Sequence, residues 1–455
     1  STSASTCRLR PVQGRLIRPR PGSEPLSFSP EYLRSRLEAL TADQPCRRWL
    51  VALSGGVDSS VLLHAVVASG DQTPVLAIHV DHGLHEDSPT WATHCQRFAA
   101  DLGVRFESLS VEIDPESGDS LEAAARDARY RAMLQYVCEG DCLLSGHHES
   151  DQAETLLLNL MRGSGPAGLA GIGAINSFGR GRLLRPLLGI ATDEISRYAR
   201  EQGLTWIDDP SNVDTRFDRN FLRKEILPRL TDRWPAAAKQ LGRSAELAGE
   251  AAELLDALAD IDIDACGTPA RLALAPMRKL PPPRQRNLLR RAVRLAGLPP
   301  IPAGRLRQAL GELVPAREDA APLVTWPGGE LRRYRDELFV LMPLGNHPDD
   351  QRRTVLPGQG SVSPGVGLGT IALVPASGVG LDPGLAAGGL ELRFRQGGEQ
   401  IRVTACGPTR PLKKLLQESG VLPWMRDRLP LLYAAGELVA VGDEWLSSDH
   451  TMTPG

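Results

Sequence analysis

The residues best suited to chemistry lie together in the segment Val51-Ala-Leu-Ser-Gly-Gly-Val-Asp-Ser-Ser60. An apolar, β-like run ends at Leu53, and the turn that follows has glycines where a backbone must approach a ligand closely. A helix is expected to begin at about Ser59, so its unpaired N–H groups and the positive end of its dipole face the turn. The segment therefore predicts a binding site for phosphate or pyrophosphate.

The same segment supplies a carboxylate, Asp58, of the kind that Mg²⁺ binds together with phosphate oxygens. The alternative is a plain glycine turn followed by a Ser/Asp helix cap. The sequence contains no G-x-x-x-x-G-K-[ST] loop, which argues against transfer of a γ-phosphate. The predicted nucleotide-binding residues are Ser54, Gly55, Gly56, Val57, Asp58 and Ser59.

Short apolar runs and longer helical patterns alternate between residues 49 and 230. Such alternation predicts right-handed crossovers and a mostly parallel sheet with helices on both faces, an α/β fold whose ligands bind at the carboxyl ends of the strands. One further helix is expected over 192–202, with Thr192 as its N-cap and Gly203 after its end. The strand candidates are 49–53, 75–80, 105–111 and 142–145, and the other helix candidates are 59–68, 91–102, 120–139 and 150–162.

The remainder of the chain predicts two smaller domains. Residues 234–313 are rich in Ala, Leu and Arg and predict a small helical domain, in which the arginines of 278–294 form a basic patch. Residues 343–389 are rich in Gly and Pro with short β-like runs such as 370–374, and they lead into a small α+β domain. The expected divisions are a disordered extension over 1–25, an α/β domain over 26–230, a helical domain over 231–345 and the α+β domain over 346–455.

Composition limits the class of protein. The chain has 455 residues, which is too long for one core, and a formal net charge of −3, so a nucleic-acid partner would need local basic patches. No apolar stretch is long enough to predict a membrane span, and the start of the chain lacks the apolar core of a secretory signal. The 7 cysteines have no disulfide-framework spacing and predict a reducing compartment, the cytoplasm.

Residues 54–59 resemble the pyrophosphate loop (PP-loop) of the N-type ATP pyrophosphatases, which cleave ATP between its α and β phosphates and use the AMP to activate a carbonyl oxygen. Other segments resemble those of the bacterial tRNA(Ile)-lysidine synthetases, in the order in which that family has them. They are 79–85 (HVDHGLH), 121–130 (LEAAARDARY), 145–155 (SGHHESDQAET), 206–212 (WIDDPSN) and 217–228 (FDRNFLRKEILP), and distally 392–399, 412–418 and 421–428.

On the helix expected over 120–139, Arg126, Arg129 and Tyr130 share one face because of their spacing. The resemblance assigns Arg126 to the α-phosphate of ATP, where a guanidinium suits the charge that builds up during adenylation. The alternative is an ordinary surface ion pair between Glu122 and Arg126.

For the segment 145–155, the resemblance implies that Asp151 is a second carboxylate associated with Mg²⁺. It also implies that His148 orients phosphate or the reacting base. One alternative is a helix that merely has an acidic first turn. Another is a zinc site, which the spacing fits poorly, built from Cys138, Cys142, His147 and His148.

Two sets of cations are expected to bind RNA. Arg219, Arg223 and Lys224 would form an exposed basic edge beside the active site, with Asn220 as a polar reader of the RNA. Lys413 and Lys414 lie on an expected helix near a tryptophan and suit the backbone of an RNA stem. Solvated helix faces with Arg–carboxylate pairs have the same sequence pattern and are the alternative.

The resemblance implies an enzyme that ligates the ε-amine of L-lysine to C2 of the wobble cytidine in the CAU-anticodon isoleucine tRNA. It uses ATP and Mg²⁺, passes through an adenylated cytidine, releases AMP and pyrophosphate, and changes codon reading from AUG to AUA. A homodimer is one option for its assembly, and no membrane association is expected.

Two alternatives remain. A tRNA thiolase with the same loop would use cysteines near the nucleotide, but Cys95, Cys138 and Cys142 have no C-x-x-C arrangement. A non-catalytic tRNA-binding module with a relict nucleotide site would not need the set Asp58, Arg126 and Asp151.

Overall fold

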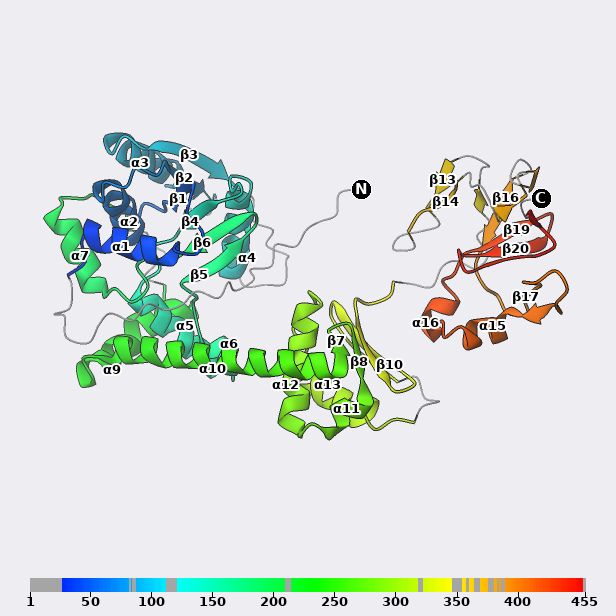
Figure 1. Cartoon of the computed structure of the whole chain (residues 1–455). Helices are drawn as coiled ribbons and strands as arrows, with labels where there is room; N and C mark the ends of the chain where they lie inside the picture. Colours follow the sequence, from blue (N-terminus) through cyan, green and yellow to red (C-terminus); the bar gives the residue numbers. More distant parts are fainter. Residues whose placement is uncertain are drawn as a thin grey trace. The chain divides into compact units, whose positions relative to one another are not determined.

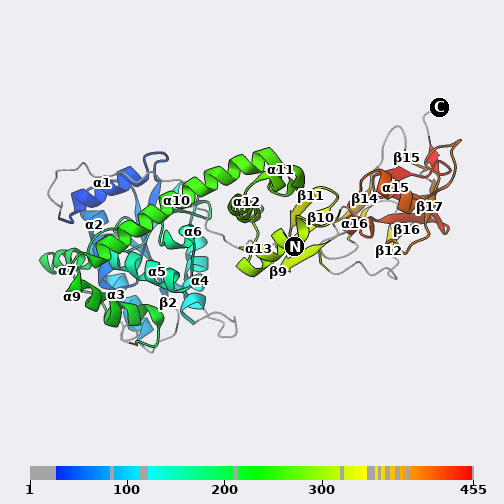
Figure 2. The ribbon, with the colours of Figure 1, turned by 90° about the horizontal axis from the view of Figure 1, so that it is seen from below.

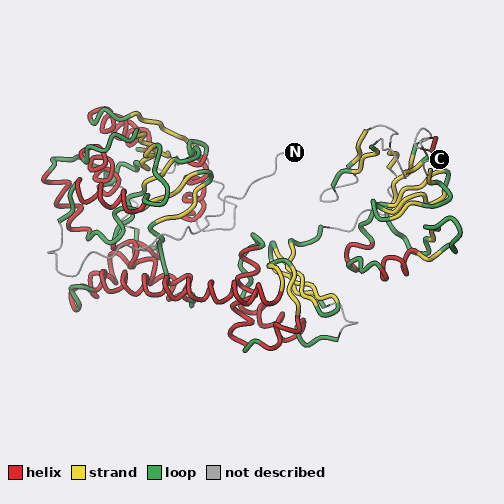
Figure 3. The backbone as a smooth tube through the Cα atoms, in the orientation of Figure 1, coloured by secondary structure: helices red, strands yellow, loops and turns green. Residues whose placement is uncertain are grey.

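The computed structural model divides into two compact units, Ser1–Leu254 and Leu255–Gly455 (Figures 1 and 3). The extension predicted over 1–25 lies outside the described residues, as do parts of two segments that resemble the lysidine synthetases, 82, 84–85 and 209–212. The described residues are 27–81, 83, 87–111, 121–208, 214–317, 322–345, 354–356, 360–363, 369–374, 380–382, 384–385 and 389–452.

The first unit contains the predicted α/β fold. Its six-stranded sheet has the order β3-β2-β1-β4-β6-β5, in which all neighbours are parallel except the last pair. The sequence predicted four of these strands to within one residue and did not predict β5 and β6. The strands are β1 (Arg48–Ala52), β2 (Val75–Asp81), β3 (Arg105–Ser110), β4 (Asp141–Leu144), β5 (Ile175–Phe178) and β6 (Gly181–Leu184).

Helices cover both faces of this sheet because alternate strand residues point to opposite sides. Trp49 and Val51 of β1 pack in one core with α1, α2, α3 and α7, whereas Leu50 packs in the other with α4. Figures 1 and 2 show α1 and α2 together on one side of the sheet. The helices of this unit are α1 (Pro30–Leu40), α2 (Val57–Ala68), α3 (Ser88–Asp101), α4 (Leu121–Leu134), α5 (Glu149–Met161), α6 (Pro166–Leu169), α7 (Thr192–Glu201), α8 (Asp218–Phe221), the π-helix η2 (Leu222–Ile226) and α9 (Leu227–Arg233).

Two details of the helix starts differ from the prediction. Helix α2 begins at Val57 rather than at about Ser59, because Gly56 already has the extended conformation of an N-cap. Helix α7 has Ala191 as its N-cap, and Thr192 is its first residue. The Thr192 hydroxyl lies 2.9 Å from the Ser150 hydroxyl, so it links α7 to α5 instead of capping its own helix.

Helix α10 (Ala237–Cys266) continues across the boundary between the units, and the second unit begins with a mixed domain. The predicted helices are present, but they pack on a five-stranded sheet of order β7-β8-β11-β10-β9 that the sequence did not predict. Glu330 and Arg333 of β10 are both buried, and such inward-facing charges hide the alternation of a strand. The elements are β7 (Gly267–Thr268), β8 (Arg271–Ala273), α11 (Leu274–Lys279), α12 (Pro282–Leu295), α13 (Ala303–Gln308), the π-helix η3 (Ala309–Leu313), β9 (Leu323–Trp326), β10 (Gly329–Tyr334) and β11 (Glu337–Leu341).

The end of the chain has the predicted α+β character. In the described part of this region, a five-stranded sheet of order β12-β16-β19-β20-β21 lies with the short helices α15 and α16 and with three two-stranded sheets. Among the described residues, no helix combines the length and apolar character that a membrane span needs. The elements are β12 (Thr354–Leu356), β13 (Gly360–Val362), β14 (Ile371–Leu373), β15 (Gly380–Leu381), β16 (Leu390–Arg393), β17 (Gln400–Ile401), β18 (Arg410–Pro411), α15 (Leu412–Glu418), α16 (Pro423–Arg426), β19 (Leu431–Ala434), β20 (Glu437–Val441), β21 (Trp445–Leu446) and β22 (Thr451–Met452).

The loop after β4 approaches the start of α2 so closely that a side chain at Gly146 would crowd the backbone of α2. A Cβ at Gly146 would lie 3.1 Å from the carbonyl carbon of Asp58 and 3.2 Å from the backbone nitrogen of Ser59. We expect Gly146→Ala to lower the free energy of unfolding by about 1–3 kcal/mol, because rigid backbone must move. Urea unfolding of the full chain measures the change. Gly242→Ala in α10 is the control, since a Cβ there meets nothing within 4 Å, and unchanged stability of Gly146→Ala would contradict the expectation.

Candidate active site

The predicted phosphate loop lies between β1 and α2. Gly55 has a φ of +89°, and a Cβ there would lie 2.7 Å from Ile207 Cδ1, so this position needs glycine. The Ser59 hydroxyl accepts a hydrogen bond from the Ser54 N–H and donates one to the Gly56 carbonyl. No side chain caps the start of α2, so its first-turn N–H groups are available to an anion.

Asp58 stands in the first turn of α2, and one of its carboxylate oxygens has no partner among the described residues. Its Oδ1 is buried and accepts no hydrogen bond, whereas its Oδ2 lies 3.6 Å from His148 Nε2. A buried carboxylate oxygen without a donor is costly. This oxygen therefore suits a ligand that brings positive charge, such as a cation.

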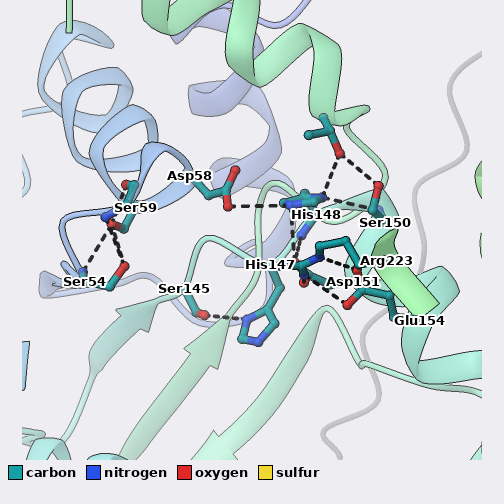
Figure 4. A network of polar contacts seen from close by, with 12 residues as sticks. Ser54, Asp58, Ser59, Ser145, His147, His148, Ser150, Asp151, Glu154 and Arg223 are labelled. Carbon is teal, nitrogen blue, oxygen red and sulfur yellow. Dashed lines mark hydrogen bonds and ion pairs between the residues drawn. The ribbon is translucent and has the colours of Figure 1, made fainter. Parts of the chain in front are cut away.

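His148 connects the two helix starts (Figure 4). It is the N-cap of α5, its N–H donates to Asp151 Oδ2 at 2.9 Å, and its Nδ1 accepts the N–H of Ser150. The ring proton is therefore on Nε2, which lies 3.6 Å from both Asp58 Oδ2 and Asp151 Oδ2. Burial lowers the pKa of His148, but these two carboxylates outweigh burial and raise the pKa above its ordinary value.

Asp151 and Glu154 face two arginines from the segment after α7. Arg223 donates from Nε to Glu154 Oε1 at 2.6 Å and from Nη2 to Asp151 Oδ1 at 3.0 Å. Arg219 lies with its Nε 3.3 Å from Glu154 Oε2 and donates to the Thr155 hydroxyl. Burial raises the pKa of Glu154, and the Arg223 guanidinium opposes that shift.

These contacts correct the prediction of an exposed basic edge. The side chain of Glu154 is 0% exposed, and that of Arg219 is 24% exposed, because both belong to a partly buried ion-pair network. Lys224 is exposed as predicted, and Asn220 donates to the backbone carbonyl of Asp214. No role was predicted for Glu154. The sequence did contain a signal for this role. Asp151 and Glu154 are three residues apart and so share a helix face, and Arg219 and Arg223, four residues apart, could present two cations to that face.

The other side of the loop after β4 is basic. The Arg126 guanidinium lies 5.1 Å from the centre of the Tyr130 ring. His147 Nδ1 lies 2.6 Å from the Ser145 hydroxyl, and Figure 4 shows this ring turned away from Asp58. Burial lowers the pKa of His147 to about 3, against the charge of Asp151 and with the help of nearby Arg185 and Arg126. The site therefore has an acidic side around Asp58 and Asp151 and a basic side around Arg126.

The alternatives for these segments have different outcomes. The side chain of Glu122 lies outside the described residues, so the alternative ion pair with Arg126 is untested. His79 is buried, and its Nδ1 lies 2.9 Å from the Leu53 carbonyl. No group of three or more His, Cys, Asp or Glu in the described part of the chain is arranged to hold a metal ion, the zinc set around Cys142 included.

The distal cations are of two kinds. Lys413 and Lys414 are exposed on α15, whose Leu412, Leu415 and Leu416 are buried, so the amphipathic helix presents both lysines to solvent. The basic patch predicted over 278–294 is corrected, because its arginines are largely paired with acidic residues. The pairs are Arg278–Asp336, Arg284–Asp262, Arg291 with Asp256 and Asp260, and Arg294–Asp256.

Three family models match the chain. A PP-loop domain matches residues 30–230, a TilS substrate binding domain matches 272–339, and a TilS substrate C-terminal domain matches 390–455. These matches cover the phosphate loop, the domain with helices α11 to α13, and the helix that carries Lys413.

Similar proteins extend over nearly the whole chain. The tRNA(Ile)-lysidine synthase of Alkalilimnicola ehrlichii is 43% identical over 94% of this chain and 96% of its own. Those of Methylococcus capsulatus and Coxiella burnetii are 40% and 37% identical, over 93% and 92% of this chain and 98% and 95% of their own. Each of these matches covers at least 92% of this chain and at least 95% of the relative. The chain belongs to the tRNA(Ile)-lysidine synthase family.

Proposed function

We propose that this chain is an AMP-forming ligase that joins the ε-amine of L-lysine to C2 of the wobble cytidine in the CAU-anticodon isoleucine tRNA. One observation carries the proposal. The glycine turn, the uncapped start of α2 and the unpartnered Asp58 oxygen lie beside the His148 cap of α5, at the carboxyl edge of a parallel sheet. The relatives do not favour the thiolase alternative.

ATP is the substrate of the phosphate loop in this proposal. The Ser54–Ser59 turn and the first N–H groups of α2 bind the departing pyrophosphate. Arg126 faces the α-phosphate, where its guanidinium stabilises the charge that builds up as the cytidine carbonyl oxygen attacks. His148 holds the start of α5 next to the start of α2 and orients the reacting groups between them.

Mg²⁺ fits Asp58 better than it fits Asp151. The Asp58 Oδ1 has no hydrogen-bond donor, whereas both oxygens of Asp151 already accept hydrogen bonds, from His148 and from Arg223. When bound, the ion would neutralise phosphate charge and help pyrophosphate to leave. Asp151 is then a secondary ligand at most, and its main effect is to hold α5 and Arg223 in place.

The second half of the reaction needs a neutral amine. The lysine ε-amine attacks C2 of the adenylated cytidine, and the bond from C2 to the oxygen that carries AMP breaks. An ammonium group has no lone pair for this attack, so its site must lower the pKa of the amine by desolvation or by a nearby cation.

The tRNA would contact Lys224 and Asn220 near the active site and Lys413 and Lys414 on α15. Exposed lysines provide mobile positive charge for phosphates, which positions an RNA without reading its sequence. A homodimer and a cytoplasmic location stay predictions, the first to be tested by sedimentation of the full chain.

Asp58→Asn tests the proposed chemistry. Removal of the charge next to the phosphate loop should lower kcat by at least about 100-fold, a size typical for loss of one preorganised electrostatic group. The assay measures AMP release that depends on both L-lysine and the CAU isoleucine tRNA. Asp101→Asn, at the exposed end of α3, is the control. Wild-type protein that releases no AMP in this assay would favour the non-catalytic module, and full activity of Asp58→Asn would contradict the role of Asp58.

Arg223→Ala separates a structural role from RNA binding. It leaves the fully buried Glu154 with Arg219 alone, so we expect the free energy of unfolding to fall by about 1–3 kcal/mol. Lys224→Ala, on the adjacent exposed residue, should change it by less than about 0.5 kcal/mol but weaken tRNA binding. Urea unfolding and tRNA titration measure the two quantities. Equal stability of the two variants would contradict the ion-pair role.

Lys413→Ala/Lys414→Ala tests the distal surface. If both lysines contact phosphates, the variant binds tRNA more weakly, and the slope of log K against log salt concentration falls in magnitude by up to about 2. Titrations between low and physiological salt give the slope. Gln417→Ala on the same helix is the uncharged control. A weaker affinity with an unchanged slope would argue against phosphate contacts.

A further inference from the structure

Arg185 is a buried guanidinium that has no counter-ion among the residues that the structure describes. It directly follows β6 and is 3% exposed. Its Nη1 donates to the Gly173 carbonyl at 2.6 Å and to Asn176 Oδ1, while its Nε is buried and has no hydrogen-bond partner. No carboxylate pairs with it among the residues that the structure describes. A buried, uncompensated charge is costly, so its retention needs an explanation.

The sheet places this charge behind the basic side of the active site. The Ser145 N–H donates to the Leu184 carbonyl at 3.0 Å, which puts Arg185 next to the loop that carries His147. Tyr130 and Arg126 lie close enough to Arg185 to shift its pKa in opposite directions, and the Arg126 guanidinium lies 5.1 Å from the centre of the Tyr130 ring. Arg185, Tyr130, Arg126 and His147 therefore form one layer at the carboxyl edge of β4 and β6.

Arg182, on strand β6, is a second buried arginine and provides a comparison for Arg185. It is 8% exposed, pairs in register with Cys142, and donates to the Gln44 carbonyl and to Cys142 Sγ near the opposite end of the sheet. Both arginines are buried and bonded to neutral acceptors. Only Arg185 lies at the edge where the phosphate loop and α5 begin.

We infer that Arg185 is a positioning residue for adenylation: a fixed positive charge that supports Arg126 and His147 where negative charge develops on the α-phosphoryl group. The inference rests on the proposed function. In this step the bond from the cytidine carbonyl oxygen to the α-phosphorus forms. The bond to the pyrophosphate oxygen breaks, and its electron pair leaves with pyrophosphate. No further reactant is needed.

The expected signature is a change in rate rather than in affinity. Arg185 is too buried to touch ATP, so it contributes little to ground-state binding. Its field acts through a region of low dielectric, and its effect grows as charge accumulates in the transition state. Loss of the charge should therefore lower kcat and leave KM for ATP nearly constant.

The test uses the full chain and the tRNA-dependent exchange of pyrophosphate into ATP without lysine, which isolates adenylation. Arg185→Gln should lower kcat of exchange by about 10- to 100-fold with KM for ATP within about 3-fold, and Arg185→Lys should recover part of the rate. Arg182→Gln is the matched control. It should lower the melting temperature yet retain the wild-type kcat at temperatures where it is folded.

Asn176→Asp distinguishes charge from structure without touching Arg185. The aspartate keeps an acceptor oxygen for Arg185 Nη1 but adds a negative charge that neutralises the guanidinium. If the role of Arg185 is only structural, the aspartate holds its side chain as well as the asparagine does or better, so the melting temperature of Asn176→Asp equals or exceeds that of the wild type. A charge role predicts a drop in the kcat of exchange. This variant decides the matter if Arg185→Gln does not fold.

The outcomes separate the two proposals. If the wild type catalyses no exchange, the proposed function fails. If the wild type is active and Asn176→Asp and folded Arg185→Gln exchange at its rate, the role of Arg185 is overturned. Slow lysine addition with normal exchange overturns it too, since the charge would then affect the second step rather than adenylation.

Discussion

The site depends on the pairing of β1 with β4 as neighbouring parallel strands. Parallel strands end at the same edge, so this pairing brings the start of α2 against the start of α5, although the chain between them is long. A Cβ at Gly146 would press on the Asp58 backbone, which shows how close the two starts lie. The positive ends of two helix dipoles meet here and raise the local electrostatic potential. The carboxylates of Asp58 and Asp151, on either side of the His148 imidazole, lower that potential.

The loop after β4 also separates charge. On one side, Asp58, Asp151 and Glu154 gather with Arg223, and Glu154 is wholly buried. On the other side lie Arg126, Arg185 and a neutral His147, and neither arginine forms an ion pair with a carboxylate among the described residues. A reaction that moves negative charge from a phosphoryl group onto a leaving pyrophosphate suits such a divided environment. The acidic side is built to hold cations and the basic side to stabilise an anion.

Arginine has different uses in different parts of this chain. On α12, Arg284 and Arg291 pair with the acids of α10, so the segment that looked like a basic surface serves mainly to attach two helices. On α15, Lys413 and Lys414 are exposed and have no carboxylate partner among the described residues. A mobile ammonium group suits a phosphate backbone, whereas the planar guanidinium suits fixed carboxylates.

The sequence by itself determined the local features. The apolar runs set β1, β2 and β4 to within a residue, because a buried strand tolerates little else, whereas β3 is a largely solvent-accessible edge strand. The glycines and Asp58 specified the phosphate loop, because only certain residues fit a tight turn before a helix. The tertiary structure alone decided which charges meet. Glu154 became the partner of Arg219 and Arg223 through contacts between residues far apart in the chain, whereas no carboxylate in the described part of the chain pairs with Arg185. The sequence shows the sign of each charged side chain, but which side chain it pairs with depends on how the strands and helices pack.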